Sequence, residues 1–265
     1  MSAVAMSVAA ATPKIRVRGL RKSFGPKVVL DGVDLDVPAA SSMVVIGGSG
    51  SGKSVLLKCV LGLMEPDAGV IEIDGVDILR QSRRERESAR ARIGMLFQNG
   101  ALFDSLPVWE NVAFGLLARR MVNRSEARER ANQFLGEVGL GPSVGDLAPA
   151  ELSGGMQKRV GLARAIAPQP DILFFDEPTT GLDPIMGAVI DGLVVDCVRR
   201  LGSTAVAITH DMASARRIGD RAAMLYHGRI IWSGPAASLM DSGNPFVDQF
   251  THGRREGPIQ MELRK

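Results

Sequence analysis

Two kinds of apolar pattern fill the first quarter of the chain. Residues 15–18 and 33–37 alternate between apolar and polar side chains, which predicts half-buried antiparallel strands. Residues 42–46 end in an unbroken apolar run, which is typical of a strand covered on both faces. A glycine-rich turn and a helical pattern at 55–63 follow directly, and residues 70–73 predict another strand before a turn.

The rest of the chain alternates between helical and strand patterns. Residues from about 99 to 167 are mostly helical by pattern. Two buried strands follow at 172–175 and 205–209, with a helix near 184–201 between them, and this order indicates a parallel sheet. The last predicted strands are 222–226 and 229–232. We therefore expect an α/β core with an antiparallel strand layer and an inserted helical segment.

These patterns divide the chain into a flexible N-terminal tail at 1–13, a main domain at 14–240 and a C-terminal extension at 241–265. The helical segment at about 99–167 forms a subdomain of the main domain. The tail is apolar, but its first basic residue is Lys14, whereas a secretory signal carries its charge before the apolar stretch. No apolar run approaches the ~20 residues that a membrane-spanning helix needs.

The C-terminal extension carries an apolar turn of its own. Phe246, Val247 and Phe250 stand at helical spacing, and Gly257-Pro258 follows them. In solvent these side chains would expose an apolar patch, so they must pack on their own subunit or on another one. The glycine and proline residues favour an extended strap that lies across a second subunit.

Composition narrows the class of protein. Of the 265 residues, 45% are hydrophobic and 23% are charged, which excludes a disordered chain, a collagen-like fibre and a disulfide-stapled miniprotein. The net charge of +3 is too small to predict a nucleic-acid partner. Cys59 and Cys197 have no Cys or His at ligand spacing, so we expect buried, reduced thiols of a cytosolic protein.

One charge run stands out. Residues 80–92 contain six arginines and two glutamates. A nucleic-acid or lipid-headgroup patch is one interpretation, but the interspersed acids favour a solvated helix. Residues 125–138 predict an amphipathic helix with Phe134, Leu135 and Val138 facing inward.

A phosphate-binding loop follows the first buried strand. Residues 47–54 read Gly-Gly-Ser-Gly-Ser-Gly-Lys-Ser, between a strand and a helix as a P-loop requires. The glycines let backbone N–H groups turn inward around phosphate oxygens, and the helix N-terminus adds a favourable dipole. Lys53 then reaches the β- and γ-phosphates and Ser54 binds Mg²⁺. The predicted phosphate-binding residues are Gly47, Gly48, Ser49, Gly50, Ser51, Gly52, Lys53 and Ser54.

Two carboxylates end the buried strand at 172–175. Asp176 and Glu177 follow four apolar residues directly, which suits a magnesium site at the carboxyl edge of a parallel sheet. Such a pair is commonplace on solvated edges, and the preceding P-loop is what favours function here. We expect Asp176 to hold the metal through water and Glu177 to polarise the attacking water as a general base.

A further segment carries a family resemblance. Residues 152–159 read Leu-Ser-Gly-Gly-Met-Gln-Lys-Arg, and with the other motifs the sequence from 14 to 240 resembles the ATP-binding-cassette (ABC) ATPases. Gln98 corresponds to the Q-loop of that family, residues 181–183 to the D-loop and His210 to the switch. The resemblance implies an ABC-type P-loop NTPase with a RecA-like core, an antiparallel β subdomain and an inserted helical subdomain.

The resemblance also implies roles for single residues. Phe24 stacks on adenine, Gln98 contacts the metal and the attacking water, and His210 contacts the γ-phosphate and Glu177. The implied catalytic residues are Glu177, His210 and Gln98; the implied metal site comprises Ser54, Gln98 and Asp176. His227 and His252 have no motif context and are expected to be structural or surface residues.

The signature segment adds a second phosphate-binding helix end. Ser153, Gly154 and Gly155 open a helix with a hydroxyl and exposed N–H groups that point at an anion. By the resemblance, the P-loop of one subunit meets the signature of the other, so that two ATP molecules are clamped in a head-to-tail dimer. Asp183 of the D-loop joins these nucleotide contacts. A single domain of this length must then dimerise to work.

The Q-loop sequence indicates a branch of the family. Residues 97–112 continue from Phe-Gln into Asn-Gly-Ala-Leu-Phe, and Met156 stands where most ABC importers have Gln; both features are similar to the Mla-type phospholipid transport ATPases. The extension resembles their short tail as far as Ile259, and the match fades beyond it. The branch implies a MlaE-type permease, a periplasmic MCE lipid-binding protein, a STAS-domain protein and a place on the cytoplasmic side of the inner membrane.

Other members of the family supply the alternatives. The chain is also compatible with another importer or exporter branch. A soluble iron–sulfur-assembly ATPase has a similar length, but the Gly-Ala-Leu-Phe stretch and Met156 argue against it. Translation and DNA-repair members carry two cassettes or a long coiled coil, and neither fits in 265 residues.

Overall fold

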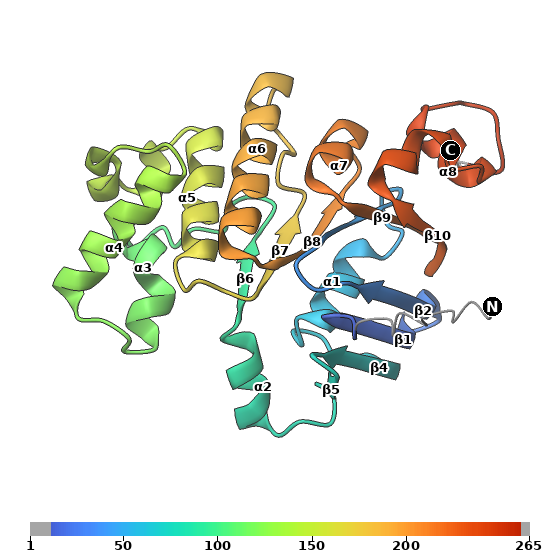
Figure 1. Cartoon of the computed structure of the whole chain (residues 1–265), viewed down its shortest axis with the longest axis horizontal. Helices are drawn as coiled ribbons and strands as arrows, with labels where there is room; N and C mark the ends of the chain where they lie inside the picture. Colours follow the sequence, from blue (N-terminus) through green and yellow to red (C-terminus); the bar gives the residue numbers. More distant parts are fainter. Residues whose placement is uncertain (1–11, 261–265) are drawn as a thin grey trace, which may run out of the picture.

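The computed structural model describes residues 12–260, so nearly all of the predicted N-terminal tail lies outside the described residues. The fold has three parts that lie side by side (Figure 1): a helical segment, a main sheet with helices packed on it, and a smaller antiparallel sheet. The sequence predicted the helical segment as an insertion, the main sheet with its helices as an α/β core, and the smaller sheet as an antiparallel layer. In the described residues, no helix has both the length and the apolar character needed to cross a membrane.

The main sheet runs in the order β10-β9-β3-β8-β7-β6. Strand β3 pairs in parallel with β8 and β9, and β7 pairs in parallel with β8 and β6, which confirms the predicted parallel core. The edge strand β10 alone is antiparallel, because a tight turn joins it to β9. The strands are β3 (Ser42–Ile46), β6 (Ile93–Leu96), β7 (Ile172–Asp176), β8 (Thr204–Thr209), β9 (Arg221–Tyr226) and β10 (Arg229–Pro235).

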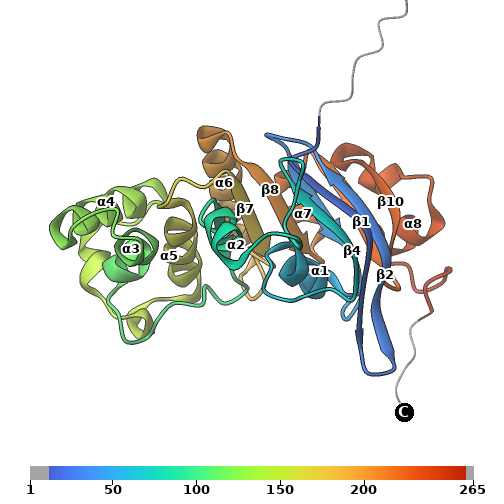
Figure 2. The same ribbon diagram turned by 90° about the horizontal axis from the view of Figure 1, so that it is seen from below.

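The smaller sheet is antiparallel and packs over the helix that follows the P-loop (Figure 2). Its order is β2-β1-β4-β5, from β1 (Ile15–Phe24), β2 (Lys27–Val37), β4 (Ala68–Ile73) and β5 (Val76–Asp77). Strand β3 lies between two cores, since Val44 and Ile46 join one and Met43 and Val45 join the other. This explains its continuous apolar sequence, because both of its faces are covered.

The helical segment consists of α3 (Val108–Ala118), α4 (Arg124–Glu137) and α5 (Gly154–Ile166). Phe134, Leu135 and Val138 face inward as predicted, and all three are buried. They belong to the same continuous core as Leu173 and Phe175 of the main sheet. The helical segment is therefore packed against the strands that carry the carboxylates, rather than attached to them only by loops.

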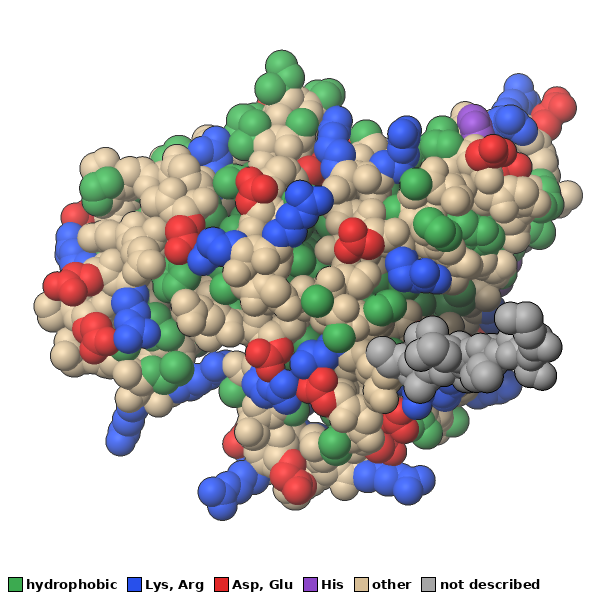
Figure 3. All heavy atoms as spheres, viewed as in Figure 1, with side chains coloured by type: hydrophobic (Ala, Val, Ile, Leu, Met, Phe, Trp, Pro, Cys, Tyr) green, Lys and Arg blue, Asp and Glu red, His purple; other side chains and the backbone are tan. Residues whose placement is uncertain are grey.

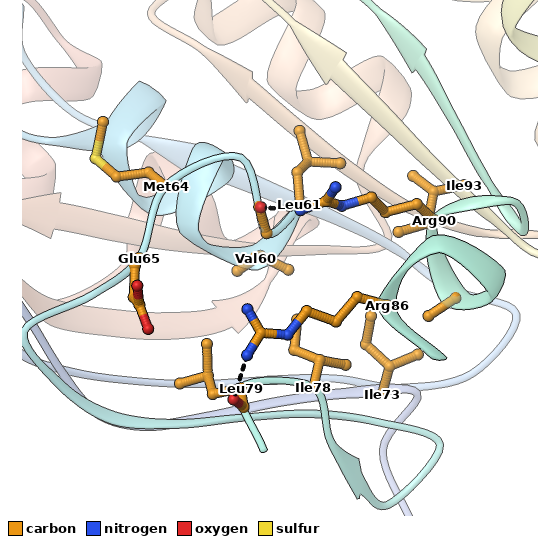
Figure 4. Close-up of a pocket in the computed structure, with 12 residues that line it drawn as sticks. Val60, Leu61, Met64, Glu65, Ile73, Ile78, Leu79, Arg86, Arg90 and Ile93 are labelled. Atoms are coloured by element: carbon orange, nitrogen blue, oxygen red, sulfur yellow. Dashed lines mark hydrogen bonds between the residues drawn. The ribbon is translucent and has the colours of Figure 1, made fainter. Parts of the chain in front are cut away.

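The arginine-rich run forms α2 (Arg83–Arg90), which no buried residue anchors. Ser82 and Glu85 form a capping box at its start. Figure 4 shows that Arg86 and Arg90 extend across an apolar hollow, where Arg86 Nη2 donates to the Leu79 carbonyl at 2.7 Å and Arg90 donates to that of Gly62. The helix is solvated as predicted, and its arginine stems cover apolar surface beneath it.

Basic and acidic side chains are interspersed on the face shown in Figure 3. Several of them form ion pairs between distant parts of the chain. Arg92, for example, lies 2.9 Å from Asp74 and 2.5 Å from Asp171. Part of the charge of the arginine-rich run is thus neutralised by acids from the two sheets.

Three further helices complete the main part: α1 (Lys53–Val60), α6 (Pro184–Leu201) and α7 (Met212–Ile218). Beyond them, α8 (Pro245–Thr251) fits the predicted helical spacing, but its packing differs from the expected strap. Val247 is fully buried in its own subunit, and Phe250 and Ile259 pack against the main core. The buried Gln249 amide pairs with both backbone groups of Ile259, at 3.0 and 2.6 Å. The apolar turn therefore has its partners within one chain.

The reactivity of Cys59 and Cys197 tests whether both side chains are buried in the core. Burial raises the pKa of Cys59 to about 11 and also raises the pKa of Cys197. With this pKa, about one Cys59 side chain in a thousand is ionised at pH 8. The thiolate is the reactive form, so Cys59 should react slowly. We expect the native chain to show no fast reaction with a thiol reagent at this pH and two reacting thiols in denaturant. Ser88→Cys, on the exposed side of α2, should add one fast thiol; fast reaction of the unaltered native chain would contradict the buried placement.

Candidate nucleotide-binding and hydrolysis site

The loop between β3 and α1 can be closed only by glycine at its two ends. Gly47 has φ +155° and a Cβ there would overlap the carbonyl oxygen of Leu225. Gly52 has φ +104° and caps α1, and a Cβ on it would lie 2.9 Å from the Val29 oxygen and 3.0 Å from Leu30. The loop is therefore pressed between the end of β9 and strand β2, and its backbone turns where any other residue would be strained.

Lys53 lies under this loop. Its side chain is buried, and Nζ donates to the carbonyls of Gly47 at 2.7 Å and Gly48 at 3.1 Å. Burial lowers the pKa of Lys53, while the negative charges of Glu177 and Asp176 oppose this shift. The ammonium group thus sits between the loop and the carboxylates, where phosphate oxygens would be attracted to it.

Several polar groups around the loop fit a nucleotide and its metal. The buried Ser51 hydroxyl has no hydrogen-bond partner among the described residues, so a phosphate oxygen would satisfy it. Ser54 is exposed on the first turn of α1. Burial raises the pKa of Asp176, and the charge of Glu177 adds to this effect. A hydroxyl and a carboxylate are the oxygen ligands that Mg²⁺ prefers, and the ion would favour the charged form of Asp176.

Glu177 is held in place from several sides. Its backbone is left-handed, with φ +50°, and its N–H donates to the Ile208 carbonyl of β8 at 2.9 Å. Its carboxylate lies 2.8 Å from Nδ1 of His210 and accepts from the Thr180 hydroxyl at 3.0 Å. The structure thus contains the predicted contact between Glu177 and His210. Thr180, which the motifs gave no catalytic role, fixes the same oxygen as His210.

The start of β2 and the P-loop border a common hollow. Phe24 is half exposed at the tip of the β1–β2 hairpin, with the Lys22 ammonium 5.8 Å from its ring centre. The hairpin residues that follow Phe24 line the hollow, and so does His227, which the sequence gave no role. The lining includes Lys27, Val28, Val29, Gly48, Ser49, Gly50, Ser51, Tyr226 and His227.

The signature residues form the second helix end. Ser153 caps α5 by accepting from the Met156 N–H at 3.3 Å, and Ser153 and Gly154 are exposed. Gly155 is buried, and a Cβ on it would lie 2.8 Å from Met186. Figures 1 and 2 show α5 and α1 apart, on opposite sides of β7 and β6. The two predicted phosphate-binding helix ends are thus not brought together within one chain.

Two other predicted site residues, Asp183 and Gln98, make local or backbone hydrogen bonds. The Asp183 carboxylate caps α6, accepting from Ile185 N at 2.9 Å and Met186 N at 3.0 Å. This hydrogen bonding is sufficient to explain an aspartate at that position. Gln98 is exposed after β6, and the structure assigns a partner to its backbone carbonyl rather than to its amide.

Comparison with known proteins identifies the family. The family described as ABC transporter matches residues 30–180. The chain belongs to the ABC transporter family. It is 42% identical over 251 residues to the probable ribonucleotide transport ATP-binding protein mkl of Mycobacterium leprae, covering 95% of this chain and 72% of that protein. It is 38% identical over 248 residues to the intermembrane phospholipid transport system ATP-binding protein MlaF of Haemophilus influenzae, covering 94% of each.

A solved ABC cassette has the same fold. A dimeric ATP-binding cassette in a post-hydrolysis state, bound to ADP and Pi, superposes with a TM-score of 0.77 at 30% identity, covering 84% of this chain and 98% of that one. The ABC-type P-loop NTPase fold predicted from the sequence is confirmed. The chain is the ATP-binding, ATP-hydrolysing subunit of an ABC transporter.

Glu177→Gln should separate nucleotide binding from hydrolysis in this ABC subunit. The amide keeps the shape of the side chain but cannot polarise water, so we expect unchanged ATP affinity and a loss in kcat of about a hundredfold or more. Steady-state hydrolysis and binding of a fluorescent ATP analogue measure the two effects. Glu129→Gln, at an exposed position on α4, is the matched control. Near-normal hydrolysis by Glu177→Gln would remove this residue from the mechanism.

A mixing experiment tests whether one site is built from two chains. Lys53→Ala should lose ATP binding, whereas Ser153→Ala should bind ATP and hydrolyse it poorly, because we expect Ser153 to serve the nucleotide of the neighbour. A mixture of the two variants should recover hydrolysis above either variant alone, since each heterodimer holds one intact site. The absence of recovery in dimers shown to exchange subunits would contradict the shared site.

Proposed function

We propose that this ABC subunit powers phospholipid transport of the Mla type. The observation that carries the proposal is the correspondence with MlaF of Haemophilus influenzae, which spans 94% of both chains. The mkl relative is more similar in sequence, but this chain spans only 72% of it. The Gly-Ala-Leu-Phe segment after Gln98 and Met156 of the signature support the same branch.

The proposed site is shared between two copies of the chain. Lys53 and the P-loop hold the phosphates of one ATP, and Ser153, Gly154 and Gly155 of the other copy close over it. Phe24 stacks on the adenine, and Asp183 completes the contacts near the phosphates. Ser153 and Gly154 are exposed at the start of α5, which lies apart from α1 of the same chain, and this supports the arrangement.

Hydrolysis is proposed to depend on the acids at the end of β7. Ser54, Gln98 and Asp176 hold Mg²⁺, which neutralises charge on the phosphates. Glu177 orients and polarises the attacking water, and His210 keeps the carboxylate in place at 2.8 Å. The hydroxyl of Ser54 and the carboxylate of Asp176, together with the Glu177–His210 contact, support these roles.

The proposed complex contains membrane and lipid-binding partners. A MlaE-type permease anchors the dimer on the cytoplasmic side of the inner membrane, and a periplasmic MCE protein and a STAS-domain protein complete it. ATP binding closes the dimer and hydrolysis reopens it, so that the motion is passed to the permease. No nucleic acid takes part.

The decisive experiment is lipid transfer by the isolated complex. The full chain is purified with its permease in mild detergent and placed in phospholipid vesicles that carry a fluorescent phospholipid. We expect ATP to drive transfer of this lipid, and the same complex with Glu177→Gln to bind ATP without transfer. Transfer that does not depend on ATP, or hydrolysis stimulated by ribonucleotides and not by phospholipids, would contradict the proposal.

A further inference from the structure

Helix α5 lies directly against the backbone that follows β6. A Cβ on Gly100 would lie only 3.0 Å from the carbonyl oxygen of Gln157, and one on Gly161 would lie 3.2 Å from the Gly100 Cα. At this distance no side chain separates the helix from the loop. Arg164 strengthens the contact, since its guanidinium donates to the carbonyls of Gly100 at 2.6 Å and Ala101 at 2.7 Å.

Lys158 makes the most unusual contact of this helix. It is 5% exposed, although lysine is rarely buried, and its Nζ donates to the carbonyl of Gln98 and to that of Glu177 at 3.3 Å. Gln98 follows β6 and Glu177 follows β7, and these strands are parallel neighbours in the sheet. One ammonium from the signature helix therefore joins the carboxyl ends of both strands.

The contact reaches Glu177 where its backbone is strained. A left-handed backbone is unfavourable for a residue with a Cβ, so it persists only where neighbours hold it. Glu177 has φ +50°, and both of its backbone polar groups are hydrogen-bonded. Its N–H donates to the Ile208 carbonyl, and its own carbonyl accepts from Lys158. Burying an ammonium is itself costly, and here the carbonyls and the nearby carboxylates of Asp176 and Glu177 offset that cost.

We propose that Lys158 is a positioning residue that sets where Gln98 and Glu177 lie relative to the signature helix. Its contacts tie the helix end that meets the neighbour's ATP to the residues that act on the chain's own ATP. A displacement of α5 when the dimer closes is then passed to the backbone of Glu177. This inference rests on the proposed role of Glu177 in hydrolysis.

The test compares full-length variants at position 158. Lys158→Met keeps the length of the side chain and removes its donors, so we expect kcat to fall about tenfold or more while KM and ATP affinity stay within about twofold. Lys158→Arg keeps a charged donor and should recover most of the loss. Arg130→Met, which removes an exposed cation of α4, should leave all three quantities unchanged.

A double variant separates this inference from the role of Glu177. If Lys158 acts through Glu177, Lys158→Met combined with Glu177→Gln should be no slower than Glu177→Gln alone. Multiplied losses would overturn the coupling of Lys158 to Glu177 and leave the role of Glu177 intact, whereas normal hydrolysis by Glu177→Gln would overturn both.

Melting curves separate positioning from folding. A kcat of Lys158→Met within about twofold of the unaltered chain would overturn the inference. So would equal losses of melting temperature and ATP affinity in the Met and Arg variants, because they would indicate a packing role. Should Lys158→Met fail to fold, Lys158→Gln carries the test: its shorter donor cannot serve both carbonyls, and an unchanged kcat would count against positioning.

Discussion

The parallel register of the main sheet is the constraint on which the site depends. Ile46 pairs with Thr209, Asp176 with Ile208, and Leu96 with Phe175, so β3, β8, β7 and β6 all end along one edge. Each strand is followed at once by a functional segment: the P-loop, His210, Glu177 and the Gln98 loop. A shift of one strand by a single residue would reverse its buried faces and move its segment away from the others. Register and chemistry are therefore fixed by the same apolar packing.

Buried charge is the second feature that organises the site. Lys53 and Lys158 are both buried, and both use backbone carbonyls as hydrogen-bond acceptors. Burial raises the pKa of Asp176, so a cation at that edge would stabilise its carboxylate. The two lysines approach this carboxylate from different elements, α1 and α5. The negative charge at the end of β7 is thus balanced by helices that belong to different parts of the fold.

Sequence patterns predicted those parts of the fold in which burial is complete or strictly periodic. Strands β3, β7 and β8 have unbroken apolar runs, and α6 was predicted at its observed bounds. Strand β6 was missed, because it is short, contains a glycine and follows a charged run. The turn at α8 has the predicted helical spacing, but spacing does not identify the surface that buries Val247. Only the folded chain shows that this surface belongs to the same subunit.

The same limit applies to the site. A P-loop and a signature are local sequence patterns, so Lys53 and Ser153 could be predicted from their neighbours along the chain. Lys158 stands in the quoted signature, yet its sequence context resembles that of a solvated lysine on a helix. Its partners, Gln98 and Glu177, are 60 and 19 residues away, and only the packing of α5 on β6 and β7 brings them together. Long-range contacts of this kind carry no sequence pattern that a single chain reveals.

Helix α5 combines an exposed N-terminus with the Lys158 contact to the backbone of Glu177. The exposed N-terminus of α5 leaves backbone N–H groups without helical partners, and an anion from another subunit would satisfy them. The other end of the same contact network reaches the backbone of Glu177 through Lys158. Helix α5 packs on the Gly100 backbone without an intervening side chain, so the proposed link predicts that the helix and the Gln98 loop move together. With the proposed roles of Ser153 and Glu177, closure on the neighbour's nucleotide would be coupled through Lys158 to the alignment of the chain's own hydrolytic residues.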